Sequence, residues 1–136
     1  MNIPLNKAFT TWAGWLVPYT IDFYLIVDCG SDHVLEQVHG AEGARLAYES
    51  HQAAIDQVGA IAAAERIDCD YARVEGFWFR GPDDGHGPDF LEKELDAARR
   101  AGAVVEMVPR IPDVPFDSGP AIRFGGQGQF HVLKYL

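Results

Sequence analysis

Cysteine is scarce in this sequence, and the two cysteines that occur stand far apart. Cys29 and Cys69 form no Cys-x-x-Cys pair, and nothing around them resembles the spacing of a disulfide framework. The scarcity therefore argues against a secreted, disulfide-stabilised domain and against a thioredoxin-like redox motif. We expect a cytoplasmic protein in a reducing compartment.

Basic residues are also few. The chain has 11 Lys and Arg against 20 Asp and Glu, which gives a formal net charge of -9. An acidic surface repels the phosphates of nucleic acids and of anionic membranes. We therefore expect neither nucleic acid nor a membrane as a partner.

Long apolar runs are absent as well. The most apolar stretch, 16–27, contains Pro18 and Asp22 and is shorter than the roughly 20 apolar residues that a membrane helix needs. It also makes a poor secretory signal, because Lys7 is the only early positive charge and no Ala-x-Ala cleavage pattern follows. We interpret residues 1–30 as an apolar leader or strand segment of uncertain origin.

From residue 31 the hydrophobic period becomes that of a helix. Ser31 or Asp32 can cap a short helical stretch, which Gly40 interrupts before a longer amphipathic helix begins. The apolar stripe of this longer helix is rich in alanine and comprises residues 44, 47, 51, 54, 55, 58, 61 and 62. Such a narrow stripe is typical of close packing against a sheet or another helix.

The second half of the chain predicts a strand, a helix and a further strand. Residues 71–80 alternate and include aromatics, which is typical of a strand with a covered face. Asp89 and Glu92 are spaced as the capping box of a helix that Gly102 ends, and 104–108 is a second strand. The expected fold class is α/β (α+β), with a mixed sheet flanked by helices.

The C-terminal tail predicts a turn, a short strand and the entry to a helix. The turn is expected at 118–120 and the strand at 121–124, where the glycine-rich stretch 125–128 should break it. A plain turn or bulge explains these glycines. The alternative, a phosphate cradle, needs a helix directly after them. We expect the chain to end within its last element.

Several short segments keep a characteristic order over roughly two-thirds of the chain. They are 43–51 (GARLAYESH), 67–71 (IDCDY), 74–77 (VEGF), 95–102 (LDAARRAG), 116–124 (FDSGPAIRF), 129–131 (QFH) and 133–136 (LKYL). Together they resemble an internal segment of the FAD-dependent oxidoreductases of the D-amino-acid-oxidase superfamily. The resemblance implies that residues 31–136 are a partial domain, corresponding to the substrate-domain portion of a two-domain flavoenzyme.

The same resemblance implies a parent activity, which is oxidation of the C–N bond of a small amine or amino acid by FAD. In the family an N-terminal Rossmann unit with a G-x-G-x-x-G turn holds the flavin. This sequence has no such turn. We therefore expect a truncated or split member with no FAD bound to the chain alone and no independent catalysis, its partner being the missing flavin domain or another subunit.

The resemblance also implies a site near the C-terminus, formed by Gln129, His131 and Lys134. In the family this stretch returns toward the flavin domain, so these residues are expected to bind substrate. Val132 departs from the family pattern, which has proline before the final run. The alternative is that Gln129 and His131 form the polar side of an edge strand, because apolar residues alternate with them.

Other candidate sites have incomplete residue sets. Cys29, Asp32 and His33 could form a metal corner, but no second ligand pair follows. A hydrolase built on Ser118, His131 and Asp117 would need a G-x-S-x-G elbow, which the sequence lacks. His51, on the apolar stripe of its helix, is expected to be packed or hydrogen-bonded.

Two other classes of function stay open. The chain could be a stand-alone α/β binding module, for which a well-formed pocket would be the sign. It could instead complete a flavoenzyme in trans, in which case apolar side chains should be exposed along the alanine-rich helix or the strand at 71–80.

Overall fold

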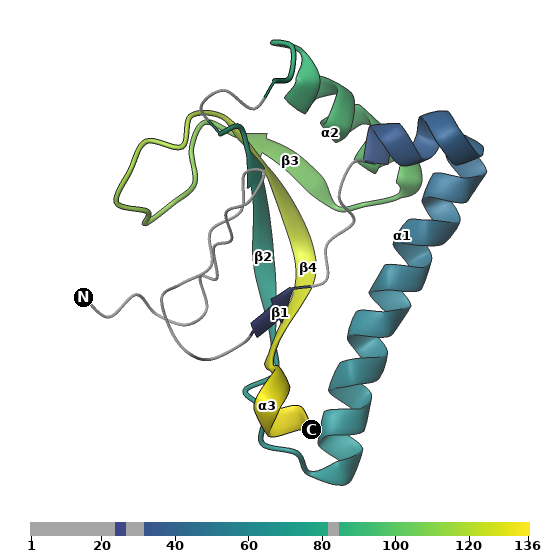
Figure 1. Cartoon of the computed structure of the whole chain (residues 1–136), viewed down its shortest axis with the longest axis vertical. Helices are drawn as coiled ribbons and strands as arrows, with labels where there is room; N and C mark the ends of the chain where they lie inside the picture. The colour runs from purple at the N-terminus through teal and green to yellow at the C-terminus, as the bar shows by residue number, and fades with distance from the viewer. Residues whose placement is uncertain (1–23, 27–31, 82–84) are drawn as a thin grey trace.

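The structure is a computed structural model of the whole chain, and it describes residues 24–26, 32–81 and 85–136 (Figure 1). Its elements are β1 (Tyr24–Ile26), α1 (Asp32–Glu65), β2 (Ala72–Phe79), α2 (Phe90–Ala101), β3 (Val105–Val108), β4 (Ala121–His131) and α3 (Val132–Tyr135). The α+β class is confirmed. Of the predicted N-terminal segment, 1–30, all but β1 lies outside the described residues.

The sheet is built around β4, the longest strand. β2 pairs with one edge of β4, while β1 and β3 pair with different parts of the other edge. Every one of these pairings is antiparallel, so the prediction of a mixed sheet is wrong for the described residues. Helix α2 connects β2 to β3, and these two strands run in the same direction. They do not pair with each other, because β4 lies between them and runs the opposite way, as in a split β-α-β unit.

The glycines of β4 form a bulge and do not end the strand. Gly125 and Gly126 stand where β2 offers one residue, because the register shifts between Val74 and Gly76. Gly126 has a φ of 72°, which glycine adopts without a steric penalty. The predicted break after residue 124 is therefore wrong, and the alternative of a plain bulge is confirmed.

Helix α2 covers the first part of β4 and supplies the largest apolar cluster. The cluster comprises Phe90, Leu91, Leu95, Ala98, Ile122 and Phe124. The predicted end of α2 is confirmed, because Gly102 has a left-handed φ of 95°. The predicted capping box is wrong. Asp89 makes no side-chain cap, and its carboxylate pairs with Lys93 at 2.7 Å instead.

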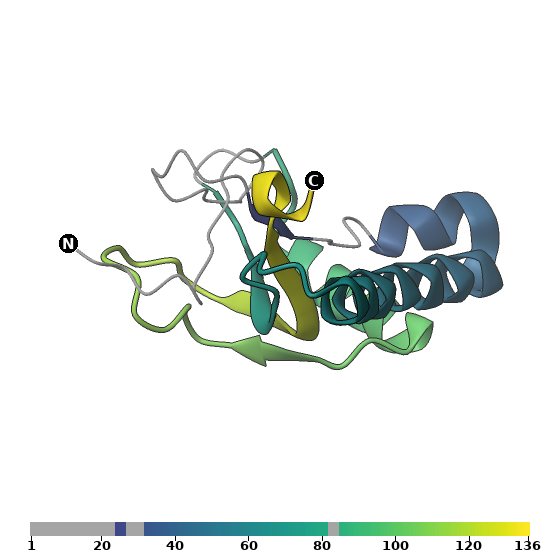
Figure 2. The same cartoon turned by 90° about the horizontal axis from the view of Figure 1, so that it is seen from below.

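Helix α1 has two parts joined at Gly40, which has non-helical dihedral angles (φ 72°, ψ 170°). We call residues 32–39 the arm and residues 41–65 the body. The bend between them confirms the interruption predicted at Gly40. Ala44, Ile55 and Ala62 of the body are buried, as the alanine-rich stripe predicted, and both views place the body alongside β4 (Figure 1 and Figure 2).

The close approach of the body to β4 depends on Gly128. A Cβ atom at this position would lie 2.6 Å from Cγ2 of Ile55, which is shorter than real contacts allow.

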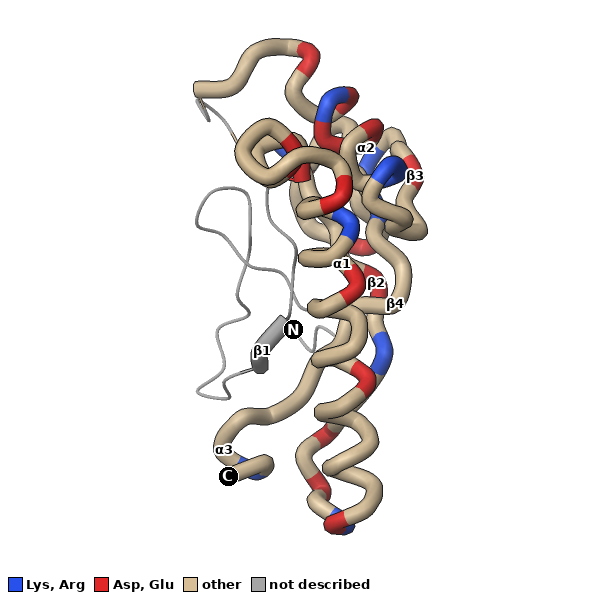
Figure 3. Tube along the Cα trace, turned by 90° about the vertical axis from the view of Figure 1, so that its right-hand side faces the viewer, with Lys and Arg blue, Asp and Glu red and all other residues tan. Residues whose placement is uncertain are grey.

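Acidic residues are spread along the molecule from α2 to the far end of α1 (Figure 3). No helix within the described ranges is long and apolar enough to cross a membrane.

Candidate functional site

The predicted site residues lie at the C-terminal end of β4 and in α3. Gln129 and His131 are only 3% and 7% exposed. Because they are two residues apart in a strand, they project from the same face of the sheet. Lys134 is set apart from them, since its ammonium group pairs with Asp70 at 2.7 Å on the surface. The structure therefore brings together two of the three predicted residues.

The edge-strand interpretation of Gln129 and His131 is wrong. In this part of the sheet β4 lies between β1 and β2, so it is a central strand. Gln129 is paired with Ile26 on one side and with Ala72 on the other. A solvent-facing polar row would be exposed, whereas these side chains are buried. The alternation in the sequence reflects a buried polar face and not a solvated one.

A third residue, Gln127, extends this buried polar row. It is 3% exposed, and its side-chain oxygen Oε1 is buried without a hydrogen-bond partner. Gly76 on β2 makes room for it, because a Cβ atom there would lie 3.0 Å from Cγ of Gln127. Gln127 was not among the site residues predicted from the sequence. The period of two in Gln127, Gln129 and His131 was the available signal, but the glycines around it were taken for a break.

Cys69 contacts the C-terminal end of β4 through its backbone and its side chain. Its carbonyl oxygen accepts a hydrogen bond from the backbone N–H of His131 at 2.7 Å, and its side chain is fully buried beside Phe130. No group of three or more His, Cys, Asp or Glu side chains that could hold a metal occurs in the described part of the chain. Cys29, the third member of the predicted metal corner, lies outside that part.

The glycine-rich stretch of β4 does not have the geometry of a flavin pyrophosphate cradle. Such a cradle places backbone N–H groups at the N-terminus of a helix. Gly125, Gly126 and Gly128 instead lie inside a strand, and Gly128 is packed against Ile55. The helix that follows the strand, α3, has four residues. This stretch is therefore part of a strand and not a phosphate cradle, so the phosphate interpretation of these glycines is wrong.

The residues of the hypothetical hydrolase triad are not brought together. Ser118 Oγ accepts a hydrogen bond from the backbone N–H of Ile111 at 2.8 Å and donates one to the carbonyl of Gly119 at 3.0 Å. These bonds fix the turn before β4. His131 lies at the opposite end of that strand, roughly 30 Å or more away for an extended chain. Ser118 therefore has a structural role in the turn.

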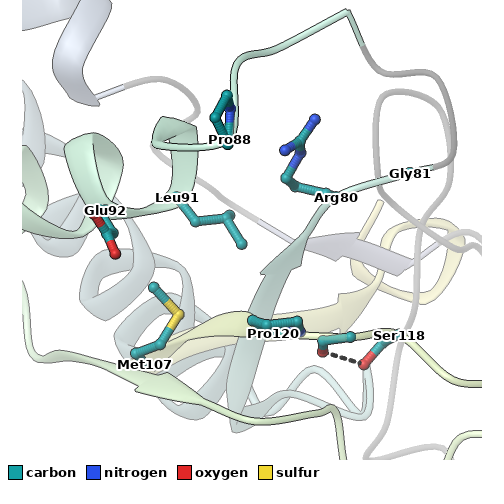
Figure 4. A pocket seen from close by; sticks show the side chains of 9 residues that line it. Arg80, Gly81, Pro88, Leu91, Glu92, Met107, Ser118 and Pro120 are labelled. Carbon is teal, nitrogen blue, oxygen red and sulfur yellow. Dashed lines mark hydrogen bonds between the residues drawn. The ribbon is translucent and has the colours of Figure 1, made fainter.

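A pocket of about 540 Å³ lies at the other end of the sheet from the polar row, between the first turn of α2, β3 and the start of β4 (Figure 4). It is lined by Arg80, Gly81, Pro88, Leu91, Glu92, Met107, Ser118, Gly119 and Pro120. Leu91 and Met107 point toward each other across it, while Arg80 and Glu92 lie on different sides (Figure 4). The sequence carried no signal for this pocket, because its lining comes from four separate segments.

The guanidinium group of Arg80 lies at the rim of this pocket (Figure 4). It donates hydrogen bonds to the backbone carbonyls of His86 at 2.7 Å and of Gly87 at 3.2 Å. These bonds tie the end of β2 to the segment before α2. The pocket thus has a largely apolar interior and a charged rim, which suits a small ligand with an apolar body.

The fold and the buried polar row define a small α+β chain with a split β-α-β core. Over 97 residues, or 71% of its length, the chain is 29% identical to a Bacillus subtilis (strain 168) protein named "Putative Rieske 2Fe-2S iron-sulfur protein YhfW". The matched segment is 18% of YhfW, so the chain spans less than a fifth of that relative's length. No family model and no solved structure matches the chain.

Proposed function

We propose that this chain is the substrate-domain portion of an FAD-dependent oxidoreductase that oxidises the C–N bond of a small amine or amino acid. The ordered segments that resemble the D-amino-acid-oxidase superfamily support this proposal, and so does the partial similarity to YhfW, whose name describes a redox protein. In this proposal the flavin-binding unit is supplied from outside the 136 residues, either by a longer polypeptide or by another subunit.

The observation that carries the proposal is the buried polar row on β4. Burying an amide or imidazole costs free energy unless each polar atom finds a partner, and Oε1 of Gln127 has none. At position 127 folding alone would therefore favour an apolar side chain. A row of polar groups kept inside a central strand is what a substrate-facing surface requires. Gln129 and His131 would then orient substrate, with Lys134 on the surface beyond them.

The flavin itself would be held by other residues, because the glycine stretch of this chain does not fit its pyrophosphate. The protein part of flavin chemistry is binding, orientation and exclusion of water, and these are the tasks left to this chain. The name of YhfW also mentions a second cofactor, a Rieske 2Fe-2S cluster. The ligands of such a cluster are two cysteines and two histidines. Cys69 is buried in an apolar cluster. We infer that the similarity to YhfW lies outside a cluster-binding part.

The experiment that tests the proposal restores the missing unit. The chain is fused to, or mixed with, the flavin-binding domain of an amine-oxidising member of the superfamily, and turnover is measured. We expect His131→Ala to lower turnover at least about tenfold without loss of the folded state, as for a group that contacts the reacting complex. His39→Ala is the matched control, because His39 is exposed on the arm of α1. Equal turnover of His131→Ala and the parent fusion would contradict the site assignment.

The form in which a flavin partner would dock also has support in the structure. Leu46 on the body of α1 is exposed, and so are Val34 and Val38 on the arm. An exposed apolar patch along the alanine-rich helix was the feature expected of a subunit that completes an enzyme in trans, and of these three side chains Leu46 lies on that helix. We expect the purified chain alone to be colourless and to self-associate. Release of stoichiometric flavin on denaturation would contradict the proposal.

The pocket lined by Leu91 and Met107 favours a second candidate function, a stand-alone binding module. Its volume of about 540 Å³ is within the usual range for small-molecule sites. Binding of an apolar fluorescent probe such as anilinonaphthalene sulfonate would be lost in Met107→Trp if the probe occupies this pocket. A monomer that unfolds in one sharp two-state transition would favour this function over the flavoenzyme portion.

A further inference from the structure

The arm of α1 brings a buried carboxyl group to its contact with α2. Asp32 is only 2% exposed, and Glu94 on α2 is 1% exposed. Of the apolar side chains of the arm, Leu35 is partly buried, while Val34 and Val38 are 44% and 68% exposed. Because carboxyl groups are buried at this contact, the attachment of the arm depends on their ionisation.

Glu94 is the centre of this attachment. Its carboxylate accepts a hydrogen bond from the backbone N–H of His33 at 3.4 Å and pairs with Nδ1 of the same histidine. The ring of His33 also meets the ring of Phe90 edge to face, with centroids 5.5 Å apart. Glu94 therefore binds the first turn of the arm through both the backbone and a side chain.

Asp32 is buried next to Glu94 without a compensating cation of its own. Its Oδ1 atom is buried and has no hydrogen-bond partner. Two carboxylates in one buried place repel each other, and a buried charge without a partner is costly. A proton on Asp32 removes both costs. The arrangement is therefore stable with a proton bound and strained without it.

The arm also has a hinge. Gly40 interrupts the helix between arm and body, so the arm can move while the body keeps its contacts with β4. Once undocked, a stretch of about eight residues is too short to stay helical in water. We propose that the arm is a proton-controlled latch, docked on α2 while the buried carboxyl group of Asp32 holds a proton and released about Gly40 when the proton is lost.

The electrostatics of the neighbouring groups agree with this direction. Burial, and after it the charge of Glu94, raises the pKa of Asp32 from 3.8 to about 6. The other ionisable groups at the contact of arm and α2 are His33, which pairs with Glu94, and Glu36, which pairs with Arg100. Arg100 holds the pKa of Glu36 below its usual value, so that ion pair persists down to acidic pH.

The sign of the pH effect follows from these shifts. A pKa that is raised in the docked state means that docking binds a proton, so docking weakens as pH rises through about 6. The Glu36–Arg100 pair acts in the opposite direction and is lost only when pH falls through the lowered pKa of Glu36. The arm should thus be docked at pH 5 and released more often at pH 7.5.

Amide hydrogen exchange of the full chain measures this directly. The protection factors of the amides of residues 36–39, corrected for intrinsic exchange rates, should fall by up to about tenfold from pH 5 to pH 7.5, because only the part of the titration window between pH 5 and about 6 lies in this range. The amides of the body around Ile55 should not change. Equal protection of the arm at both pH values would overturn the proposal.

Three variants separate the proposed cause from others. Asp32→Asn cannot ionise, so the ratio of the arm's protection at pH 5 and pH 7.5 should fall well below that of the parent chain. Glu36→Gln should lower protection equally at both values and leave the pH ratio unchanged, which makes it the control for simple loss of a contact. If Asp32→Asn does not fold, Glu94→Gln serves in its place and should reduce the pH ratio. A full pH ratio in either Asp32→Asn or Glu94→Gln would overturn the proposal.

Discussion

The two halves of β4 are buried to a similar degree but carry different chemistry. In the first half, Ile122 and Phe124 pack under α2 and leave 0% and 5% of their surface exposed. In the second half the same face of the strand carries Gln127, Gln129 and His131, which are 3–7% exposed. The apolar side chains of the first half are those that a folded core requires. The second half carries buried polar groups, and Oε1 of Gln127 among them has no hydrogen-bond partner.

The largest expected effect of a substitution lies in the apolar half. Ile122→Ala should lower the free energy of unfolding by about 3–4 kcal/mol, because it removes buried methyl groups and leaves a cavity under α2. Urea denaturation measures the change. A loss below about 1 kcal/mol would show that this half of the strand is not the core, and the contrast between the halves would disappear.

The junction between the halves gives the next largest effect. Gly128→Ala places a Cβ atom 2.6 Å from Cγ2 of Ile55, and overpacking of this kind costs about 1–3 kcal/mol. In an Ile55→Ala background the clash is absent, so the same change should cost much less. Denaturation of both single variants and the double variant measures the coupling. Additive effects would contradict the close approach of α1 to β4.

The polar half should respond differently to an apolar substitution. Gln127→Leu removes a buried oxygen that has no partner, so we expect the free energy of unfolding to change by less than about 1 kcal/mol, or to rise. In the restored flavoenzyme the same variant should lower turnover if the row faces substrate. A loss of about 2 kcal/mol or more would show that Gln127 is held by the fold, and would weaken the functional interpretation.

The smallest effect is expected at Lys134, which lies beyond the polar row. Its ion pair with Asp70 is exposed, and such pairs contribute about 0.5 kcal/mol or less. Lys134→Ala should therefore leave the midpoint of thermal unfolding unchanged within error. A clear destabilisation would place Lys134 with the structural residues of the C-terminal segment and not with the predicted site.

Most of the elements could be predicted from local patterns. Gly40 interrupts α1, Gly102 ends α2, and the alternation at 71–80 marks β2, because each signal acts on its own neighbours in the chain. The predicted capping box does not form, because the carboxylate of Asp89 pairs with Lys93 instead. That competition depends on side-chain positions, which spacing alone does not specify.

The candidate site was only partly predictable. The resemblance selected Gln129 and His131, but whether they were solvent-facing or buried depended on the neighbours of β4. Gln127 was missed because Gly125 and Gly126 looked like the end of a strand. They form a bulge, since β2 continues to pair on both sides of them. A pairing partner from another part of the chain turned a predicted break into an irregularity.

The sequence by itself determined the class of the fold, the interruption of α1 at Gly40 and the acidic character of the chain, because these follow from local propensity and composition. Only the tertiary structure decided that β4 is central, that the pocket beside Met107 exists and that Glu94 binds the first turn of α1. The physical reason is that burial and charge interactions depend on distances between segments remote in the chain. Those distances are fixed when the segments pack, and no short pattern in the sequence encodes them.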